Sequence, residues 1–458
     1  MIANNIWCKP EPYTKPGPGT LEVTKIPSDK SISHRILMFA MLEKGLTVVE
    51  NVNISGAITP LLEAMKELGV EVLVEGKTVK VGYLQRNSKN RINVPYLQFG
   101  SSSAAARLII GLLSGWGVHA IVDGDETLRP RPFDWVVDPL RELGADIEYL
   151  KEEGQLPVRI KPSILSSGKV SLTVGSAQAL SAVLYGAFAS EINVEVEQKV
   201  RARDHTQHLL TALGGVVIEN EESVKYQFRE PKHIGHYRVP ADPSAIAYPL
   251  TAHFLSGKLQ PVIFRSVCLN PTRTGYFELL KRSGLQVEYS NVSVYWGEKV
   301  GDVILNPEGK LQPLKLDSSY DFHAMIDEVP LSILLATQIT GTSEFHGLGE
   351  LTFKETNRIT ASGKMVNAFG AEITIKGFSV TVVGKQKLNN NVCVPSFGDH
   401  RLAMSAATVA SGLGMTVEIE EGKCYETSFS QFDSCFAELG FLIQADSVKE
   451  DEYEAAIG

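Results

Sequence analysis

The segment Leu61-Leu62-Glu63-Ala64-Met65-Lys66-Glu67-Leu68-Gly69-Val70-Glu71-Val72 decides the fold of this chain. Up to Leu68 its apolar residues recur with the spacing of a helix, and beyond Gly69 apolar and charged residues alternate as they do in a strand. A glycine between the two suits the left-handed backbone position that ends a helix. We therefore predict a helix, a glycine terminus and a strand, in this order.

The same pattern returns along the chain. It is found again in residues 140–147, 209–216, 279–287, 365–373 and 435–440. The intervals of roughly 70 to 85 residues are long for a solenoid but suit a repeated α/β subdomain. Such junctions also recur by chance, but the alternation typical of a hairpin follows several of them, as at residues 72–81 and 287–294. We therefore predict an α/β fold built from six such units.

Six units suggest two lobes of three. We expect residues 26–240 to form the N-terminal lobe, and residues 1–25 together with 241–458 to form the C-terminal lobe. A hinge is expected near residues 25 and 240, where Pro240 and Pro243 restrict the backbone. A cleft between two such lobes is a natural place for a site that closes on its ligands.

Composition disfavours several classes of function. The 458 residues carry a formal net charge of −9, which argues against binding to nucleic acid or to an anionic membrane. The five cysteines are scattered without the spacing of a metal site, and they indicate a reducing compartment. No apolar run approaches the roughly 20 residues of a membrane span, and the start lacks a signal-peptide pattern. We predict a cytoplasmic protein.

A cluster of charges lies in Phe353-Lys354-Glu355-Thr356-Asn357-Arg358-Ile359. If a helix begins here, Lys354 and Arg358 are four residues apart and share a face. Two fixed cations beside the Glu355 carboxylate suit an anionic substrate that must also exchange a proton. The alternative is a solvated helix face with an ion pair, and this stretch taken alone favours it.

A second candidate anion site lies nearer the N-terminus. Ser28 or Asp29 can cap a helix that begins at Lys30. Ser31 then falls in the first turn, and Arg35 follows about one turn later. Helix N–H groups, an ammonium, a hydroxyl and a guanidinium together suit a phosphate or a carboxylate. An ordinary capped amphipathic helix is an equally good interpretation of this stretch.

Two loops also present polar groups. Residues 100–106 are small and, with Arg107, lead into an apolar helix, so a ligand can approach their backbone with Arg107 behind it. A flexible serine-rich turn explains this loop at least as well. In the other loop, Pro130 and Pro132 fix the backbone around Arg131 and so present its guanidinium group.

Basic residues at helix starts and in rigid loops form a set. Its members are Lys30, Arg35, Arg131, Arg203, Lys354, Arg358 and Arg401. Such cations need a local reason in an acidic chain, and if they converge they would bind more than one anionic group. Asp327 precedes an apolar helix, where it is either an N-cap or a functional acid. The sequence has no Walker A motif and no glycine fingerprint after a strand, so nucleotide binding is not indicated.

Six ordered motifs resemble those of a known family. They are Asp29-Lys30-Ser31-Ile32-Ser33-His34-Arg35, Ser176-Ala177-Gln178, Arg203-Asp204-His205-Thr206, Asn270-Pro271-Thr272-Arg273-Thr274-Gly275, Lys354-Glu355-Thr356-Asn357-Arg358-Ile359 and Asp399-His400-Arg401-Leu402-Ala403-Met404. Their order across nearly the whole chain is similar to that of the 5-enolpyruvylshikimate-3-phosphate synthases. The resemblance implies a two-lobed enolpyruvyl-transferase fold, an inside-out α/β barrel with three βαβαββ units in each lobe.

The resemblance also implies an activity. The family transfers the enolpyruvyl group of phosphoenolpyruvate to the 5-hydroxyl of shikimate 3-phosphate and releases phosphate, a step of the shikimate pathway to aromatic amino acids. It uses neither a metal nor an organic cofactor, and we expect a monomer. Dense positive charge is needed because both substrates are anions.

The resemblance further assigns roles to residues. Shikimate 3-phosphate would be held by Lys30, Ser31, Arg35, Ser176, Ala177, Gln178, Arg203, Asp327 and Lys354. Phosphoenolpyruvate would be held by Lys30, Ser103, Arg131, Gln178, Arg358 and Arg401. Asp327 would act as the base on the 5-hydroxyl group, and Glu355 and Lys30 would carry the remaining protons.

Two stretches depart from the family pattern. The family's Gly-Asn-x-Gly-Thr loop reads Gly100-Ser101-Ser102-Ser103-Ala104 here, so Ser103 replaces the glycine that packs against phosphoenolpyruvate. The family's acidic run after the first helix and strand reads Asn53-Ile54-Ser55-Gly56-Ala57. We expect a narrowed pocket, weaker or altered binding of phosphoenolpyruvate, and poor inhibition by analogues that crowd this position, such as glyphosate.

Two alternatives accompany this interpretation. The chain is a related enolpyruvyl transferase that uses another acceptor, or it is a non-catalytic homologue. The cell-wall enzyme that modifies UDP-N-acetylglucosamine shares the fold, but it is not expected to carry the motifs at residues 176–178 and 399–401. The acids Asp327 and Glu355 argue against a protein without activity.

Overall fold

The chain divides into two compact units. The structure is a computed structural model that describes residues 4–10, 19–84, 94–198, 203–317 and 322–445. Unit 1 contains Met1–Pro27, Ala241–Ser293 and Val300–Gly458, and unit 2 contains Ser28–Pro240 and Val294–Lys299. The hinge near residues 25 and 240 stays a prediction, and the predicted lobes also include residues outside the described ranges.

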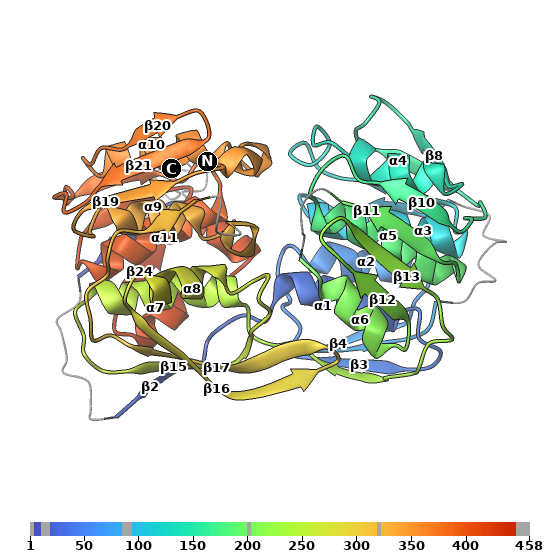
Figure 1. Cartoon of the computed structure of the whole chain (residues 1–458), viewed down its shortest axis with the longest axis horizontal. Coiled ribbons are helices and arrows are strands. Elements are labelled where there is room, and N and C mark those ends of the chain that lie inside the picture. The colour runs from blue at the N-terminus through green and yellow to red at the C-terminus, as the bar shows by residue number, and fades with distance from the viewer. Residues whose placement is uncertain (1–3, 11–18, 85–93, 199–202, 318–321, 446–458) are drawn as a thin grey trace, which may run out of the picture. The chain divides into compact units, whose positions relative to one another are not determined.

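Three α/β repeats build unit 2 (Figure 1). The first contains α1 (Lys30–Ala40), β3 (Thr47–Glu50), α2 (Thr59–Glu67), β4 (Val72–Glu75) and β5 (Thr78–Val81). The second contains β6 (Tyr96–Gln98), α3 (Ser103–Trp116), β7 (Ala120–Asp123), α4 (Asp134–Glu142), β8 (Asp146–Tyr149) and β9 (Val158–Lys161). The third contains β10 (Gly168–Ser171), α5 (Ala177–Ser190), β11 (Val194–Glu197), α6 (His205–Ala212), β12 (Val216–Glu219) and β13 (Ser223–Gln227).

The sheets of unit 2 share one strand order. It is β6-β7-β9-β8 in the second repeat and β10-β11-β13-β12 in the third, while β14 (His236–Arg238) supplies the outer strand of β14-β3-β5-β4. In each sheet the first two strands of the order given are parallel, and the remaining pairs are antiparallel. A parallel pair needs a long crossover, which α3 and α5 provide in their repeats.

Unit 1 repeats this plan. Its first repeat contains β2 (Leu21–Val23), α7 (Pro243–Leu255), β15 (Val262–Cys268), α8 (Gly275–Arg282), β16 (Gln286–Tyr295) and β17 (Glu298–Asn306). The second contains β18 (Lys315–Leu316), η2 (Phe322–Met325), α9 (Val329–Ala336), β19 (Thr342–Phe345), η3 (Leu348–Phe353), α10 (Arg358–Ala368), β20 (Thr374–Lys376) and β21 (Ser379–Val383). The third contains β22 (Val392–Pro395), α11 (His400–Gly412), β23 (Val417–Glu420), η4 (Gly422–Thr427), α12 (Phe432–Glu438) and β24 (Leu442–Ala445).

The sheets of unit 1 keep the same strand order, except that a strand from the start of the chain joins the third sheet. They run β2-β15-β17-β16, β18-β19-β21-β20 and β22-β23-β1-β24, where β1 (Ile6–Lys9) comes from the start of the chain. The described residues therefore form six four-stranded sheets, three in each unit. The predicted fold of two lobes with three repeats each is confirmed.

Glycines end the second helix of every repeat, as the sequence pattern predicts. The backbone φ angles lie between 74° and 106° at Gly69, Gly144, Gly214, Gly284, Gly370 and Gly440. Residues with a Cβ atom rarely adopt this left-handed region, so glycine closes each helix at little cost before the chain turns into a strand.

Helices α3 and α5 lie against each other in parallel within unit 2. A Cβ atom at Gly111 would lie 2.0 Å from the backbone oxygen of Ala182, and one at Gly115 would lie 2.3 Å from that of Gly186. The two contacts keep the same offset in sequence, so both helices begin at the same end of the pair. The packing thus fixes two helix N-termini beside each other. No described helix is long and apolar enough to cross a membrane.

Candidate active site

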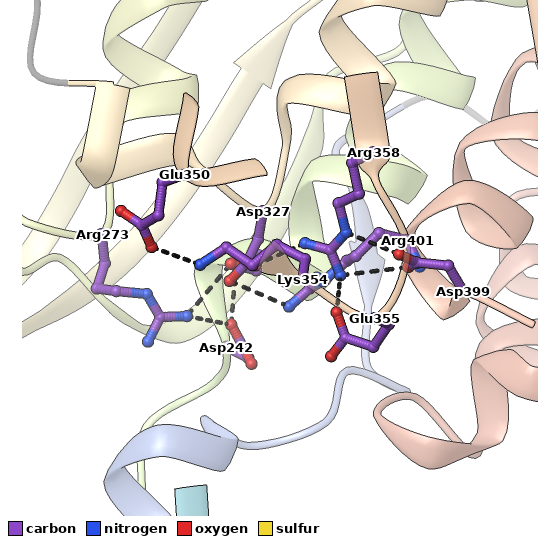
Figure 2. Close-up of polar contacts among 10 residues, drawn as sticks. Asp242, Arg273, Asp327, Glu350, Lys354, Glu355, Arg358, Asp399 and Arg401 are labelled. Atoms are coloured by element: carbon purple, nitrogen blue, oxygen red, sulfur yellow. Dashed lines mark hydrogen bonds and ion pairs between the residues drawn. The ribbon is translucent and has the colours of Figure 1, made fainter. Parts of the chain in front are cut away.

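Arg358 is the centre of a buried ion-pair cluster in unit 1 (Figure 2). Its side chain is 2% exposed, and its Nε donates to Oδ2 of Asp399 at 2.8 Å. The Nη2 atom donates to Asp399 Oδ1 at 3.2 Å and to Glu355 Oε2 at 2.7 Å, and Nη1 contacts Asp327 Oδ1 at 3.3 Å. Three carboxylates therefore surround a single guanidinium group.

Burial and charge oppose each other in this cluster. Burial alone would lower the pKa of Arg358, but the charges of Asp399, Glu355 and Asp327 raise it above its ordinary value. Burial alone would likewise raise the pKa of Asp399, but the guanidinium group outweighs it and the pKa is lowered. Arg358 and Asp399 therefore stay ionised.

Asp327 also contacts a second arginine. Its Oδ2 lies 3.4 Å from Nη2 of Arg401, so the two carboxylate oxygens face two guanidinium groups. The N-cap of α9 is Glu328, so Asp327 precedes the cap and is not the cap itself. Asp399 does cap α11, where it accepts from the backbone N–H of Arg401 at 2.9 Å. One capping aspartate thus positions both arginines.

Lys354 belongs to a neighbouring ion pair. Its Nζ lies 2.6 Å from Oε1 of Glu350, whose Oε2 lies 3.0 Å from Nδ1 of His323. Burial would raise the pKa of Glu350, but the contacts with His323 and Lys354 prevail and lower it to about 2. The acid therefore holds the lysine side chain in place while ionised.

The expectation that Lys354 and Arg358 share a helix face is wrong. Helix α10 begins at Arg358, because the side chain of Asn357 accepts from the backbone N–H of Thr360 and caps the helix there. Lys354 has an extended backbone after η3. The two cations consequently pair with different acids.

Helix α1 carries the first predicted anion site of unit 2. Asp29 caps it by accepting from the backbone N–H of Ile32 at 2.8 Å, so Lys30 and Ser31 lie in the first turn as predicted. Arg35 is buried, and its Nη1 donates to the Ser31 hydroxyl at 2.6 Å. Arg35 thus fixes the orientation of the Ser31 hydroxyl group.

Arg35 also connects α1 with two further helices. Its Nη2 donates to the hydroxyl of Ser181 in α5 at 2.9 Å, and its Nε donates to that of Thr206 in α6 at 2.9 Å. These two hydroxyl groups lie 2.8 Å apart. One guanidinium group therefore joins α1, α5 and α6.

The start of α5 contains the predicted Ser176, Ala177 and Gln178. Ser176 caps the helix, since its hydroxyl accepts from the backbone N–H groups of Gln178 and Ala179, each at 3.3 Å. Arg203 lies directly before α6 and is half-buried. Each of these residues occupies a helix N-terminus, where backbone N–H groups favour an anion.

Arg131 lies in a loop that hydrogen bonds make rigid. Asp125 Oδ1 accepts from the backbone N–H groups of Thr127 at 2.9 Å and Leu128 at 3.0 Å. Nearby, Asp123 accepts from both Nε and Nη2 of Arg129. The Nε of Arg131 donates to the carbonyl of Thr127 at 3.2 Å. The prolines noted in the sequence therefore act together with two aspartates.

The two departures from the family pattern touch each other. The hydroxyl of Ser102, in the serine-rich loop, donates to the carbonyl of Ala57 at 2.7 Å. His34 lies at the same point, with Nε2 3.1 Å from the Ala57 carbonyl and Nδ1 2.8 Å from that of Lys30. Ser103 follows as the first residue of α3 and is half-buried. Both substituted stretches thus belong to one local structure beside the start of α1.

Comparison with known proteins identifies the family. The model of EPSP synthase (3-phosphoshikimate 1-carboxyvinyltransferase) matches residues 14–435. The chain is 32% identical over 414 residues to a 3-phosphoshikimate 1-carboxyvinyltransferase of Bacillus pumilus, with 90% of this chain and 95% of that protein covered. It is also 32% identical to one of Caldicellulosiruptor saccharolyticus, with 89% and 94% covered.

The chain belongs to the EPSP synthase family.

A solved EPSP synthase from Acinetobacter baumannii agrees in fold with a TM-score of 0.84 and 26% identity, covering 97% of this chain and all of that one. The chain is therefore a transferase of the EPSP synthase family, a family of the shikimate pathway of aromatic biosynthesis.

Two acids of the ion pairs described above are not predicted from the sequence. Asp399 belongs to one of the quoted motifs but has no role among the predicted site residues, and the pairing of Glu350 with Lys354 is not among the predictions. The signal for Asp399 was its position directly before a helix, which is typical of an N-cap. The signal for Glu350 is its position four residues before Lys354, the spacing of a helical ion pair.

Proposed function

We propose that the chain transfers the enolpyruvyl group of phosphoenolpyruvate to the 5-hydroxyl of shikimate 3-phosphate and releases phosphate. Membership of the EPSP synthase family supports the reaction class. The observation that carries the proposal is the position of Asp327, whose two carboxylate oxygens face Arg358 and Arg401 at 3.3 Å and 3.4 Å. The two cations suit an anionic substrate, and the acid between them can accept a proton once they turn to that substrate.

The proposed reaction is an addition followed by an elimination. The 5-hydroxyl oxygen attacks the carbon of phosphoenolpyruvate that bears the phosphate oxygen, while a proton is delivered to the methylene carbon. Asp327 accepts the hydroxyl proton. A proton then leaves the new methyl group, the double bond returns, and the bond to phosphate breaks. Glu355 and Lys30 carry the two proton transfers at carbon.

Anion binding would also activate Asp327. A guanidinium group that turns to a substrate carboxylate or phosphate makes a weaker contact with Asp327, whose basicity then rises. Arg358 and Arg401 would do this for phosphoenolpyruvate, helped by Lys30, Arg131, Gln178 and Ser103. Shikimate 3-phosphate would be held by Lys30, Ser31, Arg35, Ser176, Ala177, Gln178, Arg203, Asp327 and Lys354.

A second candidate function is enolpyruvyl transfer to another acceptor. The contact between Ser102 and Ala57 favours it, because both departures from the family pattern meet beside the start of α1. A homologue without catalytic activity is the third possibility.

One assay separates these functions. Phosphate release from phosphoenolpyruvate is measured with shikimate 3-phosphate, without any acceptor, and with other hydroxylated acceptors. We expect release with shikimate 3-phosphate only. Release with another acceptor alone would establish the second candidate, and no release together with no binding of either substrate would establish the third.

A further inference from the structure

Arg107 of α3 joins three segments of unit 2. Its Nη1 donates to Oε1 of Gln178 at 2.7 Å, and its Nη2 donates to the carbonyl of Pro132 at 2.9 Å. The guanidinium carbon lies 4.5 Å from the ring centre of Trp135 and 4.9 Å from that of Phe133. Two aromatic rings therefore pack against the guanidinium group of Arg107, while the edge of this group makes the hydrogen bonds.

These segments carry the proposed phosphoenolpyruvate ligands of unit 2. Ser103 lies one turn before Arg107 on α3, and Arg131 directly precedes Pro132. Gln178 lies in the first turn of α5, which packs in parallel against α3. Arg107 is the side chain that contacts both of the other segments.

The contact with Arg107 dictates how the Gln178 amide faces. A guanidinium group has only N–H donors, so the atom of Gln178 that meets it must be the carbonyl oxygen. The Nε2 group is then turned away from Arg107, with two N–H donors available to another partner. An anion needs donors and is repelled by a carbonyl oxygen.

We infer that Arg107 is a positioning residue that presents the Gln178 amide to phosphoenolpyruvate as a donor. The inference rests on the proposed function for the identity of the ligand. Without Arg107 the amide can rotate by half a turn, and its oxygen then faces the anion. The Pro132 carbonyl, which also accepts from Nε1 of Trp135 at 2.6 Å, would lose one of its two donors and the Arg131 loop one of its ties.

The kinetic test uses Arg107→Lys and Arg107→Met. Lysine keeps the charge but cannot donate in two directions from a planar group. We expect both variants to raise KM for phosphoenolpyruvate about tenfold, a change of about 1.4 kcal/mol. KM for shikimate 3-phosphate, which Gln178 is also proposed to contact, should rise less, because Ser103 and Arg131 are proposed as ligands of phosphoenolpyruvate alone. Equal increases in both KM values would mean general disruption and would overturn the inference.

A matched control is Arg141→Met. Arg141 donates to the carbonyl of Ile147 at 2.7 Å and lies 4.8 Å from the ring centre of Tyr149, so it makes similar contacts outside the three segments. We expect its KM values to match those of the wild type. The double variant Arg107→Met with Gln178→Ala should lose less than the sum of the two single losses, whereas fully additive losses would contradict an action through Gln178.

A second measurement needs no turnover. The side-chain amide signals of Gln178 are identified in ¹⁵N-labelled protein by their loss in Gln178→Glu. We expect them to shift in Arg107→Lys and to keep their positions in Arg141→Met. Unchanged signals in Arg107→Lys would overturn the inference. Absence of phosphate release by the wild type would instead overturn the proposed function, and the amide signals would still decide the role of Arg107.

Discussion

The two units use arginine in different ways. In unit 1, Arg358 and Arg401 contact carboxylates, and the acids Asp327, Glu355 and Asp399 offset their charge. In unit 2, Arg35 and Arg107 donate to hydroxyl, amide and carbonyl oxygens, which carry no net charge. The contacts named for Arg358 and Arg401 are thus with carboxylates, and those named for Arg35 and Arg107 are with uncharged groups. Arg129 of unit 2 differs from the latter two, because it pairs with Asp123.

The two sets of arginines therefore lie in different electrostatic environments. Groups that exchange protons gain from acids held close to cations, as in unit 1. Helix N-termini, such as those of α1 and α5 in unit 2, favour anions. Four experiments can break or sharpen the comparison, and they are ordered from the largest expected effect to the smallest.

Removing the acid of unit 1 should cost the most activity. Asp327→Asn keeps the shape of the side chain but removes the charge that accepts a proton. We expect kcat for phosphate release to fall by about 10²- to 10⁴-fold, with a much smaller change in KM for shikimate 3-phosphate. Asp302→Asn is the control, because Asp302 pairs with Arg265 at a distance of 2.8 Å and does not belong to this cluster. Equal kcat values for the two variants would remove Asp327 from the chemistry.

Removing an arginine should destabilise unit 1 more than unit 2. Arg358→Met leaves Asp399 buried without its main counter-charge, at an expected cost of about 3–5 kcal/mol. Arg35→Met removes the donor to the hydroxyl groups of Ser31, Ser181 and Thr206, at an expected cost of about 1–3 kcal/mol. Denaturant unfolding of both variants measures the difference. A larger loss for Arg35→Met would reverse the comparison.

His34 should make the stability of unit 2 depend on pH. Burial, followed by the charge of Lys30, lowers the pKa of His34 from 6.5 to about 4. Between these values the unfolded chain binds a proton that the folded chain does not, so stability falls as the pH falls. The shift corresponds to about 3 kcal/mol.

The variant His34→Gln tests this dependence. We expect its unfolding free energy to decrease less than that of the wild type between pH 6.5 and pH 4. Parallel curves for the two proteins would show that His34 is protonated in the folded state, and the start of α1 would then carry a charge that the comparison omits.

The smallest effect is expected at the serine-rich loop. Ser103→Gly restores the family's glycine at the first position of α3. We expect KM for phosphoenolpyruvate to decrease and inhibition by glyphosate to strengthen, each about fivefold, which corresponds to roughly 1 kcal/mol. Ser101→Gly, in the same loop but exposed, is the control. No difference between the variants would show that the pocket is not narrowed here.

The sequence predicted the repeats better than the site. The glycines at positions such as Gly69 and Gly440 have one local cause, the left-handed end of a helix, so a pattern reveals them. The partners of Arg358 depend instead on the meeting of α10 and α11, which local patterns do not encode. The spacing of Lys354 and Arg358 also predicts one helix that contains both residues. The structure differs because Asn357 caps α10, which begins at Arg358.

The glycine packing of α3 and α5 has a consequence for evolution and for engineering. Gly115 lies about 18 Å along its helix from Ser103, at 1.5 Å per residue, yet it sets how close the two helices come. A methyl group added there would slide or tilt one helix against the other and shift Gln178 relative to Ser103. Libraries that seek altered ligand preference should therefore sample this distant seam as well as the residues near the ligand.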